Sequence, residues 1–528
     1  MKVLEDLIAP AVVADLVSRV ISFLVTRHAD RARRRAGTST SSSSTLRLEL
    51  LALKIHAVVD EAEGRHIAGN RRLLLWLGKL MEGMYRAYYA LDATAHGSPD
   101  HDGVFAPATA SSSWSLPFSR LVLPTKRLRA AAAAGVDHPD AVLARLEEAT
   151  EDMKEFILLL ACCPRRILAP PSVVSSFRSG EKAMFGRLVE REQMISFLLQ
   201  PGSDLGVLPV IGGPEVGKST IVKHVCSDER VRGHFSLILY SYGSLIEESK
   251  SWGDDVLATL RAGGHVLHES SASTVSGHGR RLLLVIKNSH DVVIDRVAWA
   301  ELCASLRPTA PGSKIVVISD REDDGVADLG TAPAMRVRPL PPEEYWYFFM
   351  SLALGGEDTG RRRRRPPELA ALGMRIAGAL RGSFFGAKVL GGLLRMNLDA
   401  RFWCAALNAV RRLRAAQARR RGDDGGGAGG DHLSKLDVAE IALKTLPVPL
   451  RLKSCCQTEV ASGSPPCPGV TVQQLLRSPT SVPGREEEEV RVVLWESAYP
   501  PSYRYTVVCE KVEKRPCEAL ERKRRFDP

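Results

Sequence analysis

The chain has 528 residues, several times the length of a typical domain, so two to four domains are expected rather than one core. Hydrophobic residues make up 45% and charged residues 25% of it, so we expect the bulk to be globular and not disordered or fibrous. The net charge of +11 is concentrated in short arginine runs such as Arg361–Arg365. These runs lack interleaved aromatic residues and a binding motif, which favours solvated linkers over a nucleic-acid partner.

The ten cysteines form no C-x-x-C pair and no Cys/His cluster at metal spacing. They predict reduced thiols in a cytoplasmic protein. The opening segment, residues 1–25, is partly apolar, but charged residues interrupt it. No stretch reaches the roughly 20 apolar residues that cross a bilayer, so no membrane partner is expected.

Residues 1–165 are predicted to form a helical, coiled-coil-type interaction bundle. After an opening helix, apolar side chains recur at i, i+3, i+4 and i+7 in three further segments, the last of them a single helix over 140–161. These stripes are Leu51, Ile55, Val58, Val59 and Ala62; Leu73, Leu77, Leu80, Met81, Met84, Tyr88 and Leu91; and Leu143, Leu146, Met153, Phe156, Ile157 and Leu160. Two stretches rich in Ser, Gly and Pro predict loops between the helices, and a proline-punctuated linker over 162–176 predicts the domain boundary.

From residue 180 to residue 340 the pattern changes to an α/β domain. Short β-branched runs alternate with helical segments, which is typical of a buried parallel sheet with helical crossovers. The predicted strands cover residues 207–211, 236–241, 281–286 and 313–319, with another near Val337.

Residues 341–416 are predicted to form a helical subdomain. Its aromatic run, Tyr345 to Phe349, follows a good helix start and predicts a helix that buries its rings rather than a platform for stacking bases. Residues 417–528 are read as a linker and a C-terminal extension of unknown function, with strands at 490–497 and 503–510. The predicted fold class is therefore multidomain α and α/β, with a poorly defined mixed C-terminal region.

The stretch Gly212–Ser219 is a complete G-x-x-x-x-G-K-[ST] pattern between a predicted strand and a predicted helix. Gly212 and Gly217 permit a backbone that turns consecutive N–H groups toward phosphate oxygens. Lys218 is expected to reach the β and γ phosphates and Ser219 to ligate Mg²⁺, with the helix N-terminus facing the anion.

A nucleotide-hydrolysing site also needs a carboxylate at the end of a neighbouring strand to hold the metal. The strand over 281–286 is followed instead by Lys287 and Asn288, and Asp291 comes several residues too late. We therefore expect nucleotide to bind while turnover is weak or absent, with Mg²⁺ held only weakly. The charged group Asp320–Asp323 is interpreted as a loop tip, and His224 and His234 as surface or packing histidines.

These motifs, in this order, resemble the NB-ARC domain of plant intracellular immune receptors of the coiled-coil nucleotide-binding class. The resemblance covers roughly residues 1 to 410. It rests on "FGRLVERE", the P-loop, "VRGHFSLILYSYGSL", "GSKIVVISDRED", "LPPEEYWYFFMSLALGG" and "GSFFGAKVLGGLLR", with "GMYRAYYALD" in the place of an acidic motif. It implies that ADP or ATP is bound by Phe185, Gly186, Arg187, Gly212, Gly213, Val216, Gly217, Lys218, Ser219, Thr220 and the sensor residue Arg321.

The sequence also departs from that family. Lys287 and Asn288 stand where the family has two aspartates, Phe384 replaces a proline that contacts the base, and Asp92 alone is left of the acidic motif. No Met-His-Asp triplet follows Leu394, and leucine-rich repeats are absent. The resemblance implies a defence-related nucleotide switch or adaptor whose bundle meets other proteins, including a second copy. The alternatives are an active P-loop ATPase and a scaffold that no longer binds nucleotide.

Overall fold

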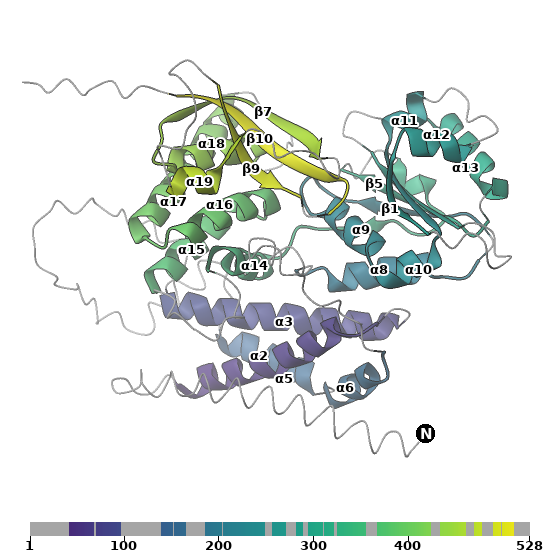
Figure 1. Ribbon diagram of the computed structural model, residues 1–528. Coiled ribbons are helices and arrows are strands. Elements are labelled where there is room, and N and C mark those ends of the chain that lie inside the picture. Colours follow the sequence, from purple (N-terminus) through teal and green to yellow (C-terminus); the bar gives the residue numbers. More distant parts are fainter. Residues whose placement is uncertain are drawn as a thin grey trace, which may run out of the picture.

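The computed structural model shows a helical bundle, an α/β domain, and a helical unit that carries a second sheet (Figure 1). No helix in the described part of the chain is long and apolar enough to cross a bilayer. The structure describes residues 42–67, 70–96, 139–151, 153–164, 185–202, 204–248, 256–270, 281–288, 294–309, 311–320, 325–354, 367–423, 433–460, 469–477, 489–497 and 499–511.

The bundle consists of α2 (Ser42–Glu63), α3 (Arg71–His96), α5 (Pro139–Thr150) and α6 (Met153–Ala161). The predicted apolar stripes form one core that includes Ile55, Leu77 and Phe156. The prediction of one helix over 140–161 was wrong, because α5 ends at Thr150 and a second helix, α6, begins at Met153. The hydroxyl of Thr150 donates to the backbone oxygen of Glu147 (2.9 Å), a side-chain bond that competes with helix continuation. The predicted opening helix lies outside the described residues.

The α/β domain is a six-stranded sheet in the order β3-β2-β4-β5-β1-β6, covered by helices on both faces. All paired strands are parallel except β3, which runs antiparallel to β2 at the edge. The strands are β1 (Gly206–Ile211), β2 (Leu237–Tyr242), β3 (His265–Glu269), β4 (Leu282–Lys287), β5 (Lys314–Ser319) and β6 (Met335–Arg336).

One face of this sheet packs against α8 (Leu188–Leu198), α9 (Lys218–Cys226) and α10 (Glu229–His234). The other packs against α11 (Ser244–Glu248), α12 (Val256–Ala262) and α13 (Arg296–Thr309), and η1 (Val326–Leu329) precedes β6. The predicted parallel sheet is confirmed. The central strands are buried on both sides, which explains their nearly continuous apolar sequence.

The helical unit contains α14 (Pro342–Leu354), α15 (Pro367–Leu380), α16 (Phe384–Met396) and α17 (Ala400–Asp423). The aromatic run lies in α14 as predicted: Trp346 and Phe349 are fully buried, and Tyr347 packs its ring on Tyr88 of α3 (centroids 5.5 Å apart). Trp346 also donates its indole N–H to Asp92 of α3 (3.1 Å). The bundle therefore packs directly against the helical unit.

The C-terminal part consists of α18 (Lys435–Thr445), β7 (Leu450–Val460), β8 (Val470–Thr471), α19 (Val472–Arg477), β9 (Val490–Glu496) and β10 (Ser502–Lys511). Its sheet has the order β7-β10-β9-β8, in which β10 is antiparallel to both neighbours. The predicted strands β9 and β10 are confirmed, whereas α18 and β7 were not predicted.

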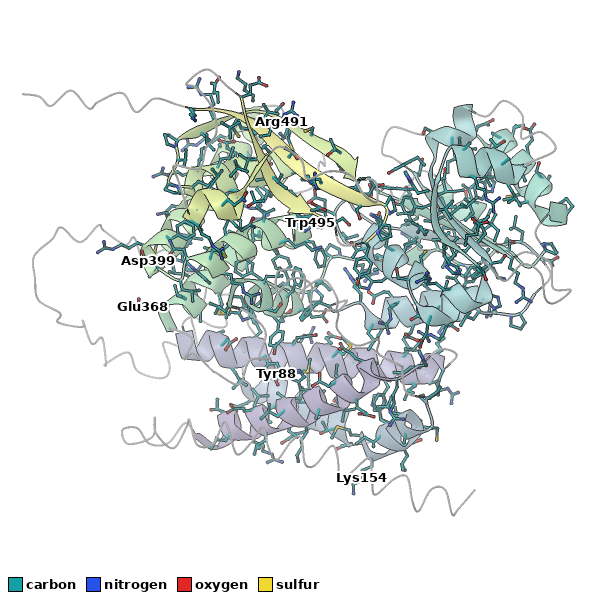
Figure 2. All side chains as sticks on the ribbon, in the orientation of Figure 1. Tyr88, Lys154, Glu368, Asp399, Arg491 and Trp495 are labelled. Atoms are coloured by element: carbon teal, nitrogen blue, oxygen red, sulfur yellow. The ribbon has the colours of Figure 1, made fainter. Side chains whose placement is uncertain are left out.

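This C-terminal sheet and the helices α14–α17 share one hydrophobic core. Trp495, at one end of β9 in Figure 2, contacts Phe385 of α16, and the ring of Tyr505 on β10 lies 5.0 Å from the same phenylalanine. The apolar core thus continues across residue 417, where the sequence suggested that an extension begins. We refer to residues 433–511 as the C-terminal unit.

Candidate functional site

The predicted phosphate loop connects β1 to α9. Gly212 has a φ of +155°, and a Cβ atom there would lie 2.2 Å from the backbone oxygen of Val337. Gly217, with a φ of +94°, caps α9, whose first residue is Lys218. Glycine is required at both positions because an L side chain rarely adopts these conformations, and at Gly212 it would also collide with the backbone. The loop therefore ends at a helix N-terminus, which favours an anion.

Lys218 is almost completely buried inside the loop. Its ammonium donates to the backbone oxygens of Gly212 (2.8 Å) and Gly213 (2.5 Å) and lies 2.7 Å from the carboxylate of Asp320. Asp320 follows β5, the strand next to β1. The lysine is thus held in the centre of the loop, with its charge balanced by an acid from the neighbouring strand end.

Ser219 and Thr220 follow in the first turn of α9. Ser219 shares a side-chain hydrogen bond with Tyr240 of β2, and burial raises the pKa of that phenol. Thr220 is exposed, and Val216 is buried one residue before the capping glycine. Of the predicted binding residues, Gly212, Gly213, Val216 and Gly217 therefore lie in the loop, and Lys218, Ser219 and Thr220 lie in the first turn of α9.

The end of β4 presents a lysine to this turn. Lys287 is the last residue of the strand, and Asn288, which is buried, donates its backbone N–H to Ile318 of β5 (2.8 Å). Burial lowers the pKa of the Lys287 ammonium, an effect that Asp320 opposes and that Lys218 and Lys435 reinforce. A cation therefore stands where a metal-binding carboxylate would be expected.

Residues 189–359 match the NB-ARC domain family. Over this range the chain is similar to NB-ARC domains. Among curated proteins, it is 26% identical over 373 residues to "Disease resistance protein RGA2" and 27% identical over 378 residues to "Putative disease resistance protein RGA1", both from Solanum bulbocastanum. The aligned regions are 68% of this chain in both cases and 35% and 34% of the relatives.

A similar match is "Putative disease resistance RPP13-like protein 1" from Arabidopsis thaliana, 26% identical over 69% of this chain and 34% of its own. The chain thus spans about a third of the length of the curated relatives it matches. Among solved structures, domain III of the Thermotoga maritima replication initiation protein DnaA aligns with 51% of this chain and 97% of its own, at 12% identity and a TM-score of 0.26.

Of the predicted binding residues before position 189, Arg187 lies at the phosphate loop and Phe185 lies at the junction with the bundle. The guanidinium of Arg187 donates to the backbone oxygens of Val216 (3.3 Å) and Arg338 (2.5 Å), and it also pairs with Glu190 (2.8 Å). Arg187 therefore connects α8 to the phosphate loop. The ring of Phe185 instead packs on Tyr85, Tyr347 and Phe348, at the junction with the bundle and α14.

Gly186 lies between these two residues with a φ of +66°, and Leu340 and Glu344 are its close neighbours. Phe384, the first residue of α16, faces the loop from the other side: a Cβ atom on Gly217 would lie 3.7 Å from its ring. Phe384 also packs on Phe348 (5.1 Å between centroids). The helical unit therefore borders the phosphate loop. Arg321 and Asp291 lie outside the described residues.

Two charged residues at the phosphate loop were not predicted. Glu215 belongs to the loop itself, and the hydroxyl of Ser383 donates to its carboxylate (3.5 Å). Burial raises the pKa of Glu215, an effect that Lys435 of the C-terminal unit opposes. The ammonium of Lys435 is held by the hydroxyl of Tyr505 (2.5 Å). Glu215 occupies a position of the phosphate-loop motif at which any residue is allowed, so the motif does not single it out. Lys435 comes more than 200 residues later, and no local pattern indicates that it faces the same loop.

Proposed function

We propose that this chain is a nucleotide-binding switch or adaptor that holds ADP or ATP and turns it over weakly or not at all. The observation that carries the proposal is the combination of a complete phosphate loop at β1 and α9 with Lys287 at the end of β4. The loop groups bind phosphate in the ground state, whereas catalysis of phosphoryl transfer needs additional stabilisation of the transition state. Binding and turnover are therefore separable here.

The chain's own residues fit a polyphosphate better than they fit Mg²⁺. Lys218 is positioned inside the loop, the N-terminus of α9 faces it, and Lys287 adds a second positive charge. Among the described residues, oxygen donors for a metal at this end of the loop include the hydroxyl of Ser219 and the carboxylate of Asp320. The Ser219 hydroxyl is bonded to Tyr240 and the Asp320 carboxylate is paired with Lys218. A lysine beside these donors competes with a metal for the phosphate charge.

We further propose a role in plant defence, in the cytoplasm. The support is the NB-ARC match together with relatives whose names include "disease resistance". The N-terminal bundle is the part proposed to contact partner proteins, including a second copy of the chain, because apolar side chains such as Leu75 and Leu158 are exposed on its surface.

A calorimetric titration of the full chain with ADP and ATP tests the proposal. We expect binding whose affinity changes little between Mg²⁺ and EDTA, with ATP hydrolysis near background. Hydrolysis at about 1 per second or faster, the low end of ordinary enzymes, would instead support the ATPase alternative. Absence of binding in both conditions would support the scaffold alternative.

Replacing Lys218 separates a working phosphate loop from a relic. We expect Lys218→Ala to weaken nucleotide binding at least about tenfold, because a charge-assisted contact to phosphate contributes about 1.5–3 kcal/mol. Lys444→Ala is the matched control, since Lys444 is exposed on α18 and pairs only locally with Glu440. Equal affinities of the two variants would contradict a role of the loop in binding.

Restoring carboxylates at the end of β4 tests the proposed role of Lys287. In the double variant Lys287→Asp with Asn288→Asp, the metal gains donors and loses a competing cation. We expect the affinity for nucleotide to become dependent on Mg²⁺, whether or not turnover follows. An unchanged Mg²⁺ dependence would show that the β4 end does not set metal use.

A further inference from the structure

Lys218, the lysine of the phosphate loop, has a protein partner for each of its donors. A lysine ammonium carries three N–H donors and no acceptor. It donates to the backbone oxygens of Gly212 (2.8 Å) and Gly213 (2.5 Å), and a carboxylate oxygen of Asp320 lies 2.7 Å from the same nitrogen. A phosphate that binds Lys218 therefore has to displace one of these three oxygens.

Asp320 is the partner that can move away. The oxygens of Gly212 and Gly213 are fixed by the loop backbone, whereas Asp320 contributes a side chain just after the end of β5. That side chain is 28% exposed, while the Lys218 side chain is only 2% exposed. Water can therefore solvate the Asp320 carboxylate after the pair separates, and the lysine stays inside the loop.

A second cation interacts with the same carboxylate. Lys287 ends β4, which pairs with β5 so that residues 287 and 318 lie opposite each other. Burial lowers the pKa of the Lys287 ammonium, and Asp320 opposes this effect, as expected for an acid close to it. Asp320 thus interacts with two of the cations that would attract a phosphate at this edge of the sheet.

A carboxylate and a phosphate are alternative partners for one ammonium. Both accept charge-assisted hydrogen bonds, and two anions beside the same lysine repel each other. In this loop motif the lysine reaches the β and γ phosphates of a nucleotide. The competition should therefore be stronger for ATP, whose γ phosphate brings additional negative charge to Lys218, than for ADP.

We propose that Asp320 is an internal anion that competes with the nucleotide for Lys218 and lowers the affinity for ATP more than the affinity for ADP. This role rests on the proposed function, because it concerns which nucleotide the same loop selects. Asp320 is then a specificity-determining residue, and the ligand class that it favours is a nucleoside diphosphate.

Titration of Asp320→Asn with ATP and with ADP, each in EDTA and in Mg²⁺, tests the competition. Asparagine keeps the shape of the side chain and removes its charge. In EDTA we expect the variant to bind ATP about tenfold or more tightly than the unmodified chain does, as expected for one additional charge-assisted contact, and to gain less for ADP. Asp320→Ala, which also removes the carboxylate, should show the same preference.

Asp328→Asn is the matched control. It removes the same charge from an acid on η1 that is exposed and pairs with Arg296 at the surface. Both of its affinities should equal those of the unmodified chain. Thermal unfolding of the three variants shows whether each is folded before it is titrated.

The remaining outcomes separate the competition from the proposed function. If nucleotide binds with the same affinities in Asp320→Asn, or with an equal gain for ATP and ADP, the proposed selectivity is overturned and the proposed function stands. Weaker ATP binding only in Mg²⁺ would make Asp320 a metal ligand instead, which also overturns it. Binding by Asp320→Asn but not by the unmodified chain would support the competition and contradict the proposed function. If neither chain binds nucleotide, both fail.

Discussion

Charged side chains from distant parts of the sequence meet at the phosphate loop. Among the described residues, they include the cations Lys218, Lys287 and Lys435 and the anions Glu215 and Asp320. With all five ionised, this group carries one net positive charge, which favours a phosphate. Because Lys287 occupies a strand end and Lys435 the first turn of α18, both charges are positioned by folded elements rather than by the loop alone.

A partly buried carboxyl group also lies near the loop, at the junction of bundle, α/β domain and helical unit. Glu344 is in the first turn of α14, and its carboxylate oxygen lies next to Gly186. Burial raises the pKa of Glu344 to about 7; Glu190, Glu82 and Glu343 reinforce this shift, and Arg187 opposes it. An unfolded glutamate titrates at about 4.3, so between that pH and about 7 the folded chain binds the extra proton.

The sign of the resulting pH dependence follows from linkage. Because the folded state holds more protons in this window, the Glu344 contribution to stability falls as pH rises from about 4.3 to about 7. Glu344→Gln removes the charge, and we expect its Tm to exceed that of the unmodified chain by more at pH 8 than at pH 6. Glu343→Gln, at the neighbouring position, is the control in thermal unfolding. A Tm difference that is equal at both pH values would contradict the assignment.

At the scale of single elements, the conformation of the phosphate loop depends more on Gly212 than on the neighbouring Gly213. A Cβ on Gly212 would lie 2.2 Å from the backbone oxygen of Val337, whereas one on Gly213 would meet only a side-chain carbon of Val216, at 3.9 Å. Val337 also donates its N–H to Ile211 (2.8 Å), so the segment after β6 cannot move away without losing that bond.

We therefore expect Gly212→Ala to destabilise the fold by at least about 1 kcal/mol, the low end of overpacking, and to abolish tight nucleotide binding. Gly213→Ala should unfold close to the unmodified chain. Chemical denaturation and a nucleotide titration of the two variants measure both effects. A Gly212→Ala protein as stable as Gly213→Ala would show that the turn is more adaptable than its geometry indicates.

The elements that the sequence predicts are those whose pattern is local. The strands β1, β2, β4 and β5 are continuous apolar runs, and the phosphate loop is a fixed motif between a strand and a helix. The strand β3 was missed because it lies at the sheet edge, is not fully buried at any position, and carries polar residues such as His265 and Glu269. The strand β7 was missed because its exposed residues interrupt any apolar alternation.

The site was predicted only in part for the same reason: only its local patterns can be read from the sequence. The loop residues and Lys287 are close in space because adjacent parallel strands end at the same edge of the sheet, which sequence reasoning can anticipate. The positions of Lys435, of the turn between β9 and β10 and of the Phe185 ring depend on how separate units pack together. Such contacts have no signal in a single sequence, because they join residues that are about 100 or more positions apart.

At the scale of the whole molecule, the decisive feature is the core that joins helices α14–α17 to the C-terminal unit. The helix α18 packs on α16 and α17, and α19 and β9 also contact α16. Buried residues such as Trp403, Leu443 and Val507 belong to one cluster. We propose on this basis that the folding unit beginning at residue 341 continues to about residue 511, and that no independent unit begins at residue 417.

Truncation tests this division. A chain ending at Asp423 loses the C-terminal unit and exposes the apolar faces of α16 and α17, and a large exposed apolar patch promotes association. We expect this chain to aggregate in size-exclusion chromatography and to unfold at a lower temperature than the full chain. A chain ending at Lys511 keeps every described contact and should match the full chain in both measurements. A monomeric chain ending at Asp423 with an unchanged Tm would instead show that residues 433–511 fold as a separate extension, and that their shared core contributes little to the stability of the helical unit.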